Sequence, residues 1–396
     1  MFQHVEPAPP DAILGLTEAF KAEGNPEKIN LGVGVYQDAE GKTPVLATVR
    51  EATRRLSDQL VSGYLPITGA PQYAAAVQQL MFGQDHEVLT SGRAATSHTP
   101  GGTGALRVTA DFLSNQLPSA RVWMTDPTWA NHPAIFSAAG IELKTLPYFD
   151  NTTNGLALDA LLSSLREAAA GDAVLLHGCC HNPTGIDPTP AQWSQIADLI
   201  YDRGLLPILD FAYQGFAAGI DEDTAGLQAL LRPGVELIVC SSFSKNFGLY
   251  RQRAGAVTFI CESADRAATV QSQVKRCIRT NYSNPPAHGA DLVTTILGDA
   301  ALRSAWVDEV AAMRDRINGM RTLLVDKLAE HGARGDYEFV KHQRGMFSFS
   351  GLTRDEVERL KTEYAIYIVG SGRINIAGIS AANVDRLCGA IAAVTA

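Results

Sequence analysis

Short apolar runs alternate with amphipathic stretches between about residues 90 and 260 of this 396-residue chain. Five of the runs are apolar almost throughout and are typical of buried strands: RVWMT, AVLLH, LLPILD, LIVCS and AVTFI. Between them, LDALLSSLREA and AQWSQIADLIYDRG repeat apolar residues at helical spacing. This alternation predicts an α/β fold with a mostly parallel central sheet that is flanked by helices on both faces.

The pattern changes after residue 300. Residues 301–332 keep apolar positions at roughly helical spacing, which predicts one long helix bridging two domains. Thr353 and Glu356 have capping-box spacing and predict the start of another helix. The Pro-rich EPAPPD near the N-terminus cannot be helical, whereas ILGLTEAFKAE after it has helical spacing. We therefore expect an N-terminal arm (1–12), a small α/β domain (13–41 and 313–396) and a large domain (42–312).

Composition and charge narrow the class of protein. Hydrophobic residues make up 46% and charged residues 19%, as in ordinary globular proteins. The net charge of -9 argues against a protein that binds nucleic acid or an anionic membrane. Six cysteines in so long a chain do not form a disulfide scaffold, and neither a secretory signal nor a membrane-spanning run is apparent. We expect a soluble protein of the cytoplasm.

Chemically active side chains follow four of the predicted strands. Ligands of open α/β sheets bind beyond the carboxyl ends of the strands, so these residues are the candidates for a site. In chain order they are Trp129 after RVWMT, Asn182 after AVLLH, Asp210 and Tyr213 after or at the end of LLPILD, and Ser242, Ser244 and Lys245 after LIVCS. Between them they offer an indole, an amide, a carboxylate, a phenol, hydroxyls and an amine.

The stretch TPGGTGALRV offers a place for an anion. Backbone N–H groups of Gly101, Gly102 and Thr103 would stand at the start of a helix, where the helix dipole favours a phosphate. On its own this pattern indicates a plain helix start equally well. Ser242, Ser244 and Arg253 supply the hydroxyls and the guanidinium that suit a phosphate.

HGCCH, residues 177–181, raises the alternative of a metal site, because histidine and thiolate both bind zinc. All four candidate ligands crowd one strand end, where alternate side chains point to opposite faces. We therefore expect no metal, and buried cysteines flanked by hydrogen-bonded histidines instead.

Taken together, these side chains describe a site for pyridoxal phosphate. An amine near cations loses its proton more readily and can form a Schiff base. A carboxylate against the pyridine nitrogen keeps the ring protonated, so that it acts as an electron sink. A phenol and an amide can hydrogen-bond the phenolic oxygen of the ring, and an indole can stack on its face.

The stretches SFSKNFGLYRQR, HGCCHNPTG and DFAYQGF carry a family resemblance. With them the chain resembles the class I pyridoxal-phosphate aminotransferases, and among these the bacterial aspartate and aromatic-amino-acid group. The likeness extends from KINLGVGVYQD near the start to SGRINIAG near the end. It implies pyridoxal-phosphate transferase fold type I, with a large cofactor-binding domain and a smaller domain.

The resemblance also implies a role for each matched residue. Lys245 would form the Schiff base and shuttle the substrate proton, and Asp210 would pair with the pyridinium nitrogen, with His132 behind it. Tyr213 and Asn182 would hold the phenolic oxygen, and Trp129 would stack on the ring. The phosphate would be bound by Gly102, Thr103, Ser242, Ser244 and Arg253. For His132 and Ser244 a supporting role and a direct one are both open.

In this family the site is shared across a homodimer. Tyr64 matches the tyrosine that reaches the phosphate in the neighbouring subunit, and Arg279 matches the arginine that binds a side-chain carboxylate there. Arg373 matches the arginine that grips the α-carboxylate of the substrate. Gly34 and Phe347 match residues that line and cover the pocket, which Trp129 and Asn182 also border; for Phe347 a merely supporting role is open too.

The expected reaction is a ping-pong transamination between L-aspartate or glutamate and 2-oxoglutarate or oxaloacetate. The alternative is an aromatic-amino-acid aminotransferase, in which Arg279 swings aside for tyrosine or phenylalanine. Thr103 and Asn284 are typical of the aspartate enzymes, whereas Ala130 and Gln37 leave the preference open. A pyridoxal-phosphate lyase or decarboxylase fits less well, because two carboxylate-binding arginines suit dicarboxylates. A non-catalytic regulator would be expected to have lost Lys245.

Overall fold

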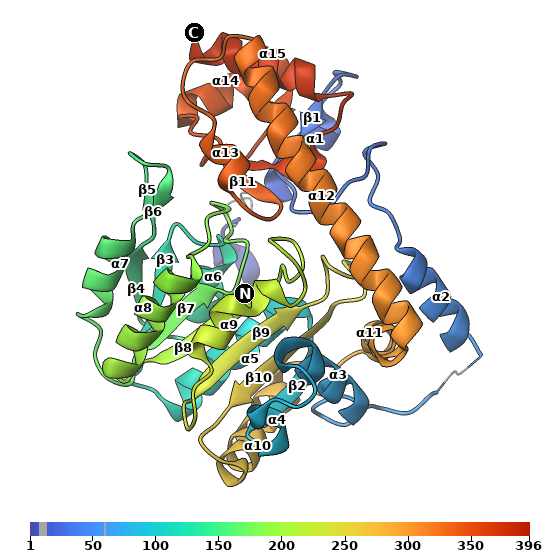
Figure 1. Ribbon diagram of the computed structural model, residues 1–396, viewed down its shortest axis with the longest axis vertical. Coiled ribbons are helices and arrows are strands. Elements are labelled where there is room, and N and C mark those ends of the chain that lie inside the picture. Colours follow the sequence, from blue (N-terminus) through green and yellow to red (C-terminus); the bar gives the residue numbers. More distant parts are fainter. Residues whose placement is uncertain (8–13, 59–60) are drawn as a thin grey trace. The chain divides into compact units, whose positions relative to one another are not determined.

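The computed structural model describes residues 1–7, 14–58 and 61–396, and the chain divides into two compact units (Figure 1). Unit 1 comprises residues 1–43, 183–185 and 316–396, and unit 2 comprises residues 44–182 and 186–315. Part of the expected N-terminal arm, residues 8–12, lies outside the described residues. The domain bounds expected from the sequence stay a prediction.

A seven-stranded sheet forms the centre of unit 2, in the order β2-β10-β9-β8-β7-β3-β4. Its strands are β2 (Ala94–Pro100), β3 (Val122–Asp126), β4 (Leu143–Pro147), β7 (Ala173–His177), β8 (Leu206–Phe211), β9 (Leu237–Ser242) and β10 (Ala254–Ile260). Strands β4, β3, β7, β8 and β9 pair in parallel, and β10 runs antiparallel to both of its neighbours. The prediction of a mostly parallel sheet is confirmed, and all five apolar runs are strands.

The reversed direction of β10 follows from its short connection. Only residues 243–253 separate β9 from β10. A crossover between parallel strands needs a dozen or more residues and usually contains a helix. A loop as short as this one therefore leads into an antiparallel strand. That loop contains Lys245, and the register of the parallel strands places Asp210 beside His177 and Cys240.

Helices cover both faces of this sheet, as the sequence predicts. Helices α5 (Gly101–Gln116), α6 (Asn131–Ser137) and α10 (Ala264–Asn281) share one core with the sheet, into which Phe112, Phe136 and Val274 point. Helices α8 (Pro190–Asp202) and α9 (Ala225–Leu230) pack on each other across the front of the sheet in Figure 1. Strand residues of both faces are buried, Ile208 toward the first core and Leu209 away from it.

The remaining elements of unit 2 surround this sandwich. They are α2 (Ala47–Leu56), α3 (Pro71–Phe82), α4 (Glu87–Thr90), α7 (Leu158–Leu165), α11 (Ala287–Gly298), η2 (Glu222–Thr224) and the hairpin of β5 (Phe149–Asp150) and β6 (Gly155–Leu156). The predicted helices of 158–168 and 191–204 are α7 and α8.

Unit 1 is built from short strand pairs and helices. Its elements are η1 (Phe2–His4), α1 (Leu14–Ala22), β1 (Ile29–Asn30), α13 (Phe339–His342), β11 (Phe347–Phe349), α14 (Arg354–Tyr364), β12 (Ile366–Tyr367), β13 (Arg373–Asn375), η3 (Ile376–Gly378) and α15 (Val384–Thr395). Strand β1 pairs with β12, and β11 pairs with β13. The capping box of Thr353 and Glu356 is confirmed at the start of α14.

The long predicted helix is α12 (Ala300–Glu330), and the two units divide between its residues 315 and 316. In unit 1 its Arg321 is 1% exposed and donates hydrogen bonds to the carbonyl oxygens of Gly345 (2.8 Å) and Phe347 (2.6 Å). A buried guanidinium is tolerated only where such acceptors satisfy it. Arg321 therefore fixes the segment that leads into β11. Among the described residues, no helix has the length and apolar character needed to cross a membrane.

Candidate active site

Lys245 lies in the loop after β9, and neighbouring residues hold that loop. The side-chain amide of Asn246 donates to the carbonyl oxygen of Gln214 (3.2 Å), and the indole N–H of Trp306 donates to the carbonyl oxygen of Asn246 (2.8 Å). The Trp306 ring also stacks on Phe247 at 4.4 Å between centroids, with both side chains fully buried. Because Gln214 follows Tyr213, this bond brings the lysine beside the phenol.

The amine of Lys245 is activated by its surroundings. Its Nζ lies 4.5 Å from the centroid of the Tyr213 ring. Burial lowers the pKa of Lys245 to about 8, the negative charge of Asp210 opposes this, and the positive charge of Arg253 adds to it. An amine with this pKa is partly unprotonated near neutral pH, so it can act as a nucleophile and as a base.

Asp210, at the end of β8, forms a buried chain of hydrogen bonds. Its Oδ2 lies 2.9 Å from Nε2 of His132, and Nδ1 of His132 lies 2.8 Å from the hydroxyl of Thr128. Burial alone would raise the pKa of Asp210, but the hydrogen bond from His132 and nearby positive charge lower it overall. The carboxylate is thus ionised, so Nε2 of His132 donates to it, and the bond between Nδ1 and Thr128 orients the ring.

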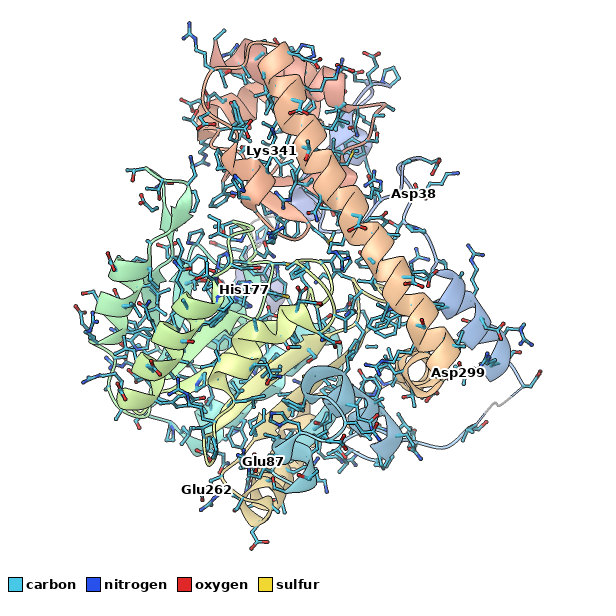
Figure 2. The ribbon with its side chains drawn as sticks, in the orientation of Figure 1. Asp38, Glu87, His177, Glu262, Asp299 and Lys341 are labelled. Carbon is cyan, nitrogen blue, oxygen red and sulfur yellow. The ribbon has the colours of Figure 1, made fainter. Side chains whose placement is uncertain are left out.

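Two further histidines pack behind this row of hydrogen-bonded side chains. The His177 ring lies 5.1 Å from that of His132 and 4.4 Å from that of His181. His181 accepts or donates one hydrogen bond with Thr125 (3.0 Å) and stacks on Tyr148 at 3.9 Å. Burial, followed by the positive charges of His132 and Lys245, lowers the pKa of His177 to about 3, and the negative charge of Asp210 opposes this. These rings are therefore neutral, and they form an aromatic floor at the upper end of the sheet, where Figure 2 labels His177.

The four candidate metal ligands of HGCCH do not gather at one point. His177 groups with His132 and Asp210, whereas Cys179 and Cys180 group with Asp223. Asp210 is already bonded to His132. Asp223 accepts four backbone N–H groups, from Gly215, Ala217, Ala218 and Gly219. Both carboxylates are thus engaged by the protein itself.

A cradle of donors lies where α5 begins. The side chain of Arg253 donates from Nη1 to the hydroxyl of Ser244 (3.2 Å), and the hydroxyls of Ser242 and Ser244 are 3.3 Å apart. A Cβ on Gly102 would lie 3.1 Å from that of Ser242, and a Cβ on Gly101 would lie 2.7 Å from Nη2 of Arg253. Two serine hydroxyls, a guanidinium and a helix N-terminus thus converge, and within the described residues no side chain caps that helix.

Trp129, Thr103 and Asn182 complete the group in unit 2. The indole of Trp129 meets the His132 ring edge-on at 5.2 Å between centroids. Thr103 lies in the first turn of α5, and Asn182 is 4% exposed after β7. The structure therefore brings together, at one end of the sheet, every unit 2 residue that the sequence assigns to the cofactor, except Tyr64.

Unit 1 holds a second cluster, formed by Arg373, Phe347 and Gly34. The guanidinium of Arg373 lies 4.3 Å from the centroid of the Phe347 ring and donates to the carbonyl oxygen of Gly32 (2.5 Å). A Cβ on Gly34 would lie 2.8 Å from the far edge of the same ring, so only glycine fits there. The pairing of β11 with β13 brings Phe347 and Arg373 together.

Tyr64 and Arg279 stand outside the Lys245 cluster. The side chain of Tyr64 is 97% exposed. Arg279 is also exposed, near the end of α10, and hydrogen-bonds the hydroxyl of Ser283. Within the described part of the chain, no hydrogen bond or ring contact joins either of them to the Lys245 cluster. Asn284, which follows this turn, donates to the carbonyl oxygen of Leu65 (3.2 Å), so the segments of Tyr64 and Arg279 are linked.

Sequence reasoning missed Thr128 and the part that His177 plays in the cluster. Thr128 stands four residues before His132 in DPTWANH, and that spacing was the available signal. From its sequence context, His177 is a candidate metal ligand or a buried histidine and nothing more. Its packing against His132 depends on the order of β7 and β3 in the sheet, which the local sequence does not contain.

Comparison with known proteins agrees with this arrangement. Residues 26–391 match the family model for aminotransferase class I and II. The chain is 51% identical to the aspartate aminotransferase of Escherichia coli strain K12 and 45% identical to its aromatic-amino-acid aminotransferase, each over all of both chains. A crystal structure of the aromatic-amino-acid aminotransferase from Burkholderia pseudomallei, covalently bound to pyridoxal phosphate, superimposes with a TM-score of 0.97 at 48% identity, covering 100% of both chains.

Proposed function

The chain belongs to the class I and II aminotransferase family, and we propose that it is a pyridoxal-phosphate-dependent aspartate aminotransferase. It exchanges the amino group between L-aspartate or glutamate and 2-oxoglutarate or oxaloacetate by a ping-pong mechanism. The observation that carries this proposal is the cluster in unit 2. There an amine of pKa about 8 lies against Tyr213, beside an ionised Asp210 and a cradle for a phosphate.

The residues of the cluster fit the cofactor. The N-terminus of α5, with Gly102 and Thr103, and the side chains of Ser242, Ser244 and Arg253 would hold the phosphate. The phosphate would also satisfy the guanidinium, whose charge lies close to the lysine. Asp210 would accept a hydrogen bond from the protonated pyridine nitrogen. Its bond from His132 keeps it ionised, and such bonds to charged groups contribute about 1.5–3 kcal/mol each.

When bound, pyridoxal phosphate supplies an electron sink for the charge that develops at the substrate α-carbon. The residues of this chain supply the rest. Lys245 would bind the cofactor covalently. Once released, its amine would take the proton from the substrate α-carbon and deliver it to the cofactor. Tyr213 and Asn182 would fix the phenolic oxygen, and Trp129 would cover one face of the ring. Each of these roles rests on the family match of its motif.

Substrate recognition would fall to arginines. Arg373 would bind the α-carboxylate through two parallel hydrogen bonds, because a guanidinium presents a planar fork that matches a carboxylate. The Phe347 ring and Gly32 hold that guanidinium in place. Arg279 would bind the second carboxylate of a dicarboxylate, and leaving this cation unpaired in a closed pocket would penalise other substrates. The higher identity to the aspartate enzyme supports the same preference.

A homodimer would complete the site. Tyr64 is 97% exposed, and Val61 (89%), Phe2 (86%) and Val5 (71%) are apolar side chains that also reach solvent in the single chain. A partner subunit that covered such side chains would be stabilised by the apolar area removed from water. In our proposal Tyr64 and Arg279 reach the phosphate and the substrate in the partner subunit. The protein would act in the cytoplasm, consistent with its buried free cysteines.

Steady-state kinetics of the cofactor-loaded protein would test this function. With 2-oxoglutarate as the acceptor, aspartate should exceed tyrosine and phenylalanine in kcat/KM by about 100-fold or more, since a site built for a charged group rejects analogues that lack it. Arg279→Leu should reduce the value for aspartate far more than that for phenylalanine. If aromatic substrates equal aspartate in the unaltered protein, the activity is that of an aromatic-amino-acid aminotransferase. No transfer with any of the three would reject the proposal.

A further inference from the structure

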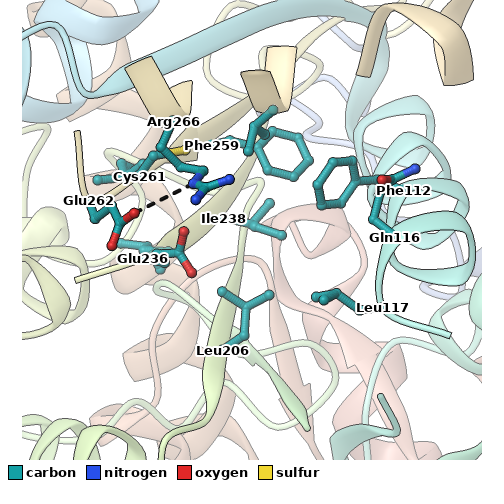
Figure 3. Close-up of a pocket in the computed structure, with 13 residues that line it drawn as sticks. Phe112, Gln116, Leu117, Leu206, Glu236, Ile238, Phe259, Cys261, Glu262 and Arg266 are labelled. Carbon is teal, nitrogen blue, oxygen red and sulfur yellow. Dashed lines mark hydrogen bonds and ion pairs between the residues drawn. The ribbon is translucent and has the colours of Figure 1, made fainter. Parts of the chain in front are cut away.

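Unit 2 has a cleft at the end of the sheet opposite to Lys245. It is a cleft of about 330 Å³ lined by residues at the starts of β8 and β9, at the end of β10 and on α5 and α10 (Figure 3). Leu206, at its floor, precedes Asp210 by four residues, which is about 13 Å along a strand. We call this site the strand-start cleft. Figure 2 labels Glu262, one of its residues, at the lower end of the sheet and His177 at the other.

The floor of the strand-start cleft is apolar. The rings of Phe112 and Phe259 lie 4.7 Å apart at 59°, and Ile238 and Leu206 continue the surface beside them. Leu117, at the end of α5, is 40% exposed although it is a large apolar residue. The volume lies at the lower end of the range for small-molecule sites, so the cleft suits a body of about one ring.

The rim of the cleft carries an excess of negative charge. It holds two carboxylates, Glu236 and Glu262, and one guanidinium, Arg266. The side chains of Glu262 and Arg266 form a long ion pair (3.5 Å) in which both groups are more than half exposed, and such pairs contribute little. Figure 3 shows the carboxylate of Glu236 below this pair, and in the described part of the chain it forms no ion pair or hydrogen bond of its own.

Glu236 is therefore the carboxylate with which a bound cation would form an ion pair. Although the residue reaches solvent, partial burial of its carboxyl group raises the pKa of Glu236, the like charge of Glu262 adds to this and Arg266 opposes it. A cation placed between the two carboxylates would offset their repulsion and stabilise the ionised form of Glu236. An anion would be repelled by two carboxylates and attracted by one guanidinium.

We propose that the strand-start cleft binds a small organic cation, namely an ammonium group on an aromatic body, separately from the active site. The aromatic body packs on Phe112 and Phe259, and the ammonium lies between Glu236 and Glu262. Two sources share this chemistry: a simple arylalkylamine, and an aromatic amino acid whose carboxylate would turn to Arg266. The inference does not depend on the proposed function, because none of its residues belongs to the active site.

Tertiary amines can test the proposal on the cofactor-loaded protein, because they cannot form an imine with the cofactor. N,N-dimethyl-2-phenylethylamine is titrated by calorimetry, and the absorbance of the cofactor is followed in the same samples. We expect one saturable site per chain with no change in absorbance. N,N-dimethylphenylalanine binding more tightly, with a gain that Arg266→Gln removes, would identify the amino-acid source, and any other result would identify the simple amine. 2-Phenylethanol, which lacks the cation and carries no carboxylate for Arg373, should bind at least tenfold more weakly than the amine.

Variants locate the site. Glu236→Gln removes the charge with little change of shape, and it should weaken amine binding at least tenfold while transamination stays unchanged. Glu40→Gln, an exposed carboxylate of unit 1, is the matched control and should leave binding as it was. The proposal is overturned if no saturable binding is found, if Glu236→Gln binds the amine as well as the unaltered protein does, or if the uncharged alcohol binds equally.

Discussion

At the scale of single residues, the environment of Lys245 determines the chemistry that we assign to the chain. Burial beside Arg253 lowers its pKa, whereas the ionised Asp210 limits that shift. Asp210 in turn stays ionised because His132 donates to it, and Thr128 orients His132. One amine is thus tuned through three residues that come from different parts of the chain.

This tuning has a consequence for stability that can be measured. The pKa of Lys245 is lowered from 10.5 to about 8 in the folded protein. Between these two pH values the unfolded chain binds more protons than the folded chain does, so the free energy of unfolding of the cofactor-free protein should rise with pH there. Lys245→Met should remove this part of the rise. Urea unfolding of both proteins at pH about 7.5 and about 9.5 would show it. Equal slopes in the two proteins would contradict the lowered pKa.

Single residues were also where the sequence was most informative. Asp210, Tyr213, Ser242 and Lys245 could be singled out because each stands where an apolar run ends, and parallel strands end together. Thr128 and the packing of His177 could not. Their roles come from the neighbours that the sheet order gives them, and no local pattern encodes that order.

At the scale of elements, Gly101 at the start of α5 is a position that tolerates no side chain. Its φ is +73°, and a Cβ would lie 2.7 Å from Nη2 of Arg253. Gly101→Ala should cost about 1–2 kcal/mol for the left-handed backbone alone. If that strain displaces the phosphate cradle, the affinity for the cofactor falls by about tenfold.

Spectrophotometric titration of the cofactor-free variant with pyridoxal phosphate would measure this. Gly298→Ala is the control, because a Cβ there meets nothing within 4 Å. Unchanged affinity in Gly101→Ala would show that this end of α5 does not bind the phosphate.

The capping box of α14 gives a prediction about stability alone. Thr353 accepts from the backbone N–H of Glu356 (3.3 Å), and the Glu356 carboxylate accepts from that of Thr353 (2.6 Å). Thr353→Ala should lower the free energy of unfolding by about 1 kcal/mol. Thr362→Ala, in the same helix but away from its start, should change it by less than about 0.5 kcal/mol. Urea unfolding compares the two, and equal effects would contradict the role of the cap.

Helices and strands could be predicted where their hydrophobic pattern is uninterrupted. The five apolar runs are strands and residues 301–332 form α12, apart from their last two residues. Strand β2, with the sequence AATSHTP, has no such run. Its polar residues are buried all the same, and Thr96 among them forms a hydrogen bond with Thr258 (2.9 Å). The direction of β10 follows from the length of the loop before it and not from its hydrophobic pattern.

At the scale of the whole molecule, our proposal divides the work between two subunits. Arg279 and Tyr64 are exposed in the single chain, and the loops that carry them are joined by Asn284. A residue that serves the neighbouring subunit should be accessible in this way. The homodimer itself is part of our proposal.

Mixing two inactive variants would test this division. Lys245→Ala lacks the amine, and Arg279→Leu lacks the clamp for the second carboxylate. In a hybrid dimer, one site would contain both Lys245 and the partner's Arg279. Unfolding and refolding the two variants together should restore activity toward aspartate at about a quarter of the sites, as random pairing requires. No recovery, with hybrid dimers present, would place Arg279 in the same subunit as its Lys245.

The most direct test of the central claim is to find the residue to which the cofactor is attached. Reduction of the cofactor-loaded protein with borohydride, followed by digestion and mass spectrometry, would locate the modified lysine. Our account predicts a phosphopyridoxyl group on the peptide that contains Lys245, in stoichiometric yield, and its loss when aspartate converts the cofactor to its amine form before reduction. Labelling of a different lysine, or of none, would contradict the assignment of this site.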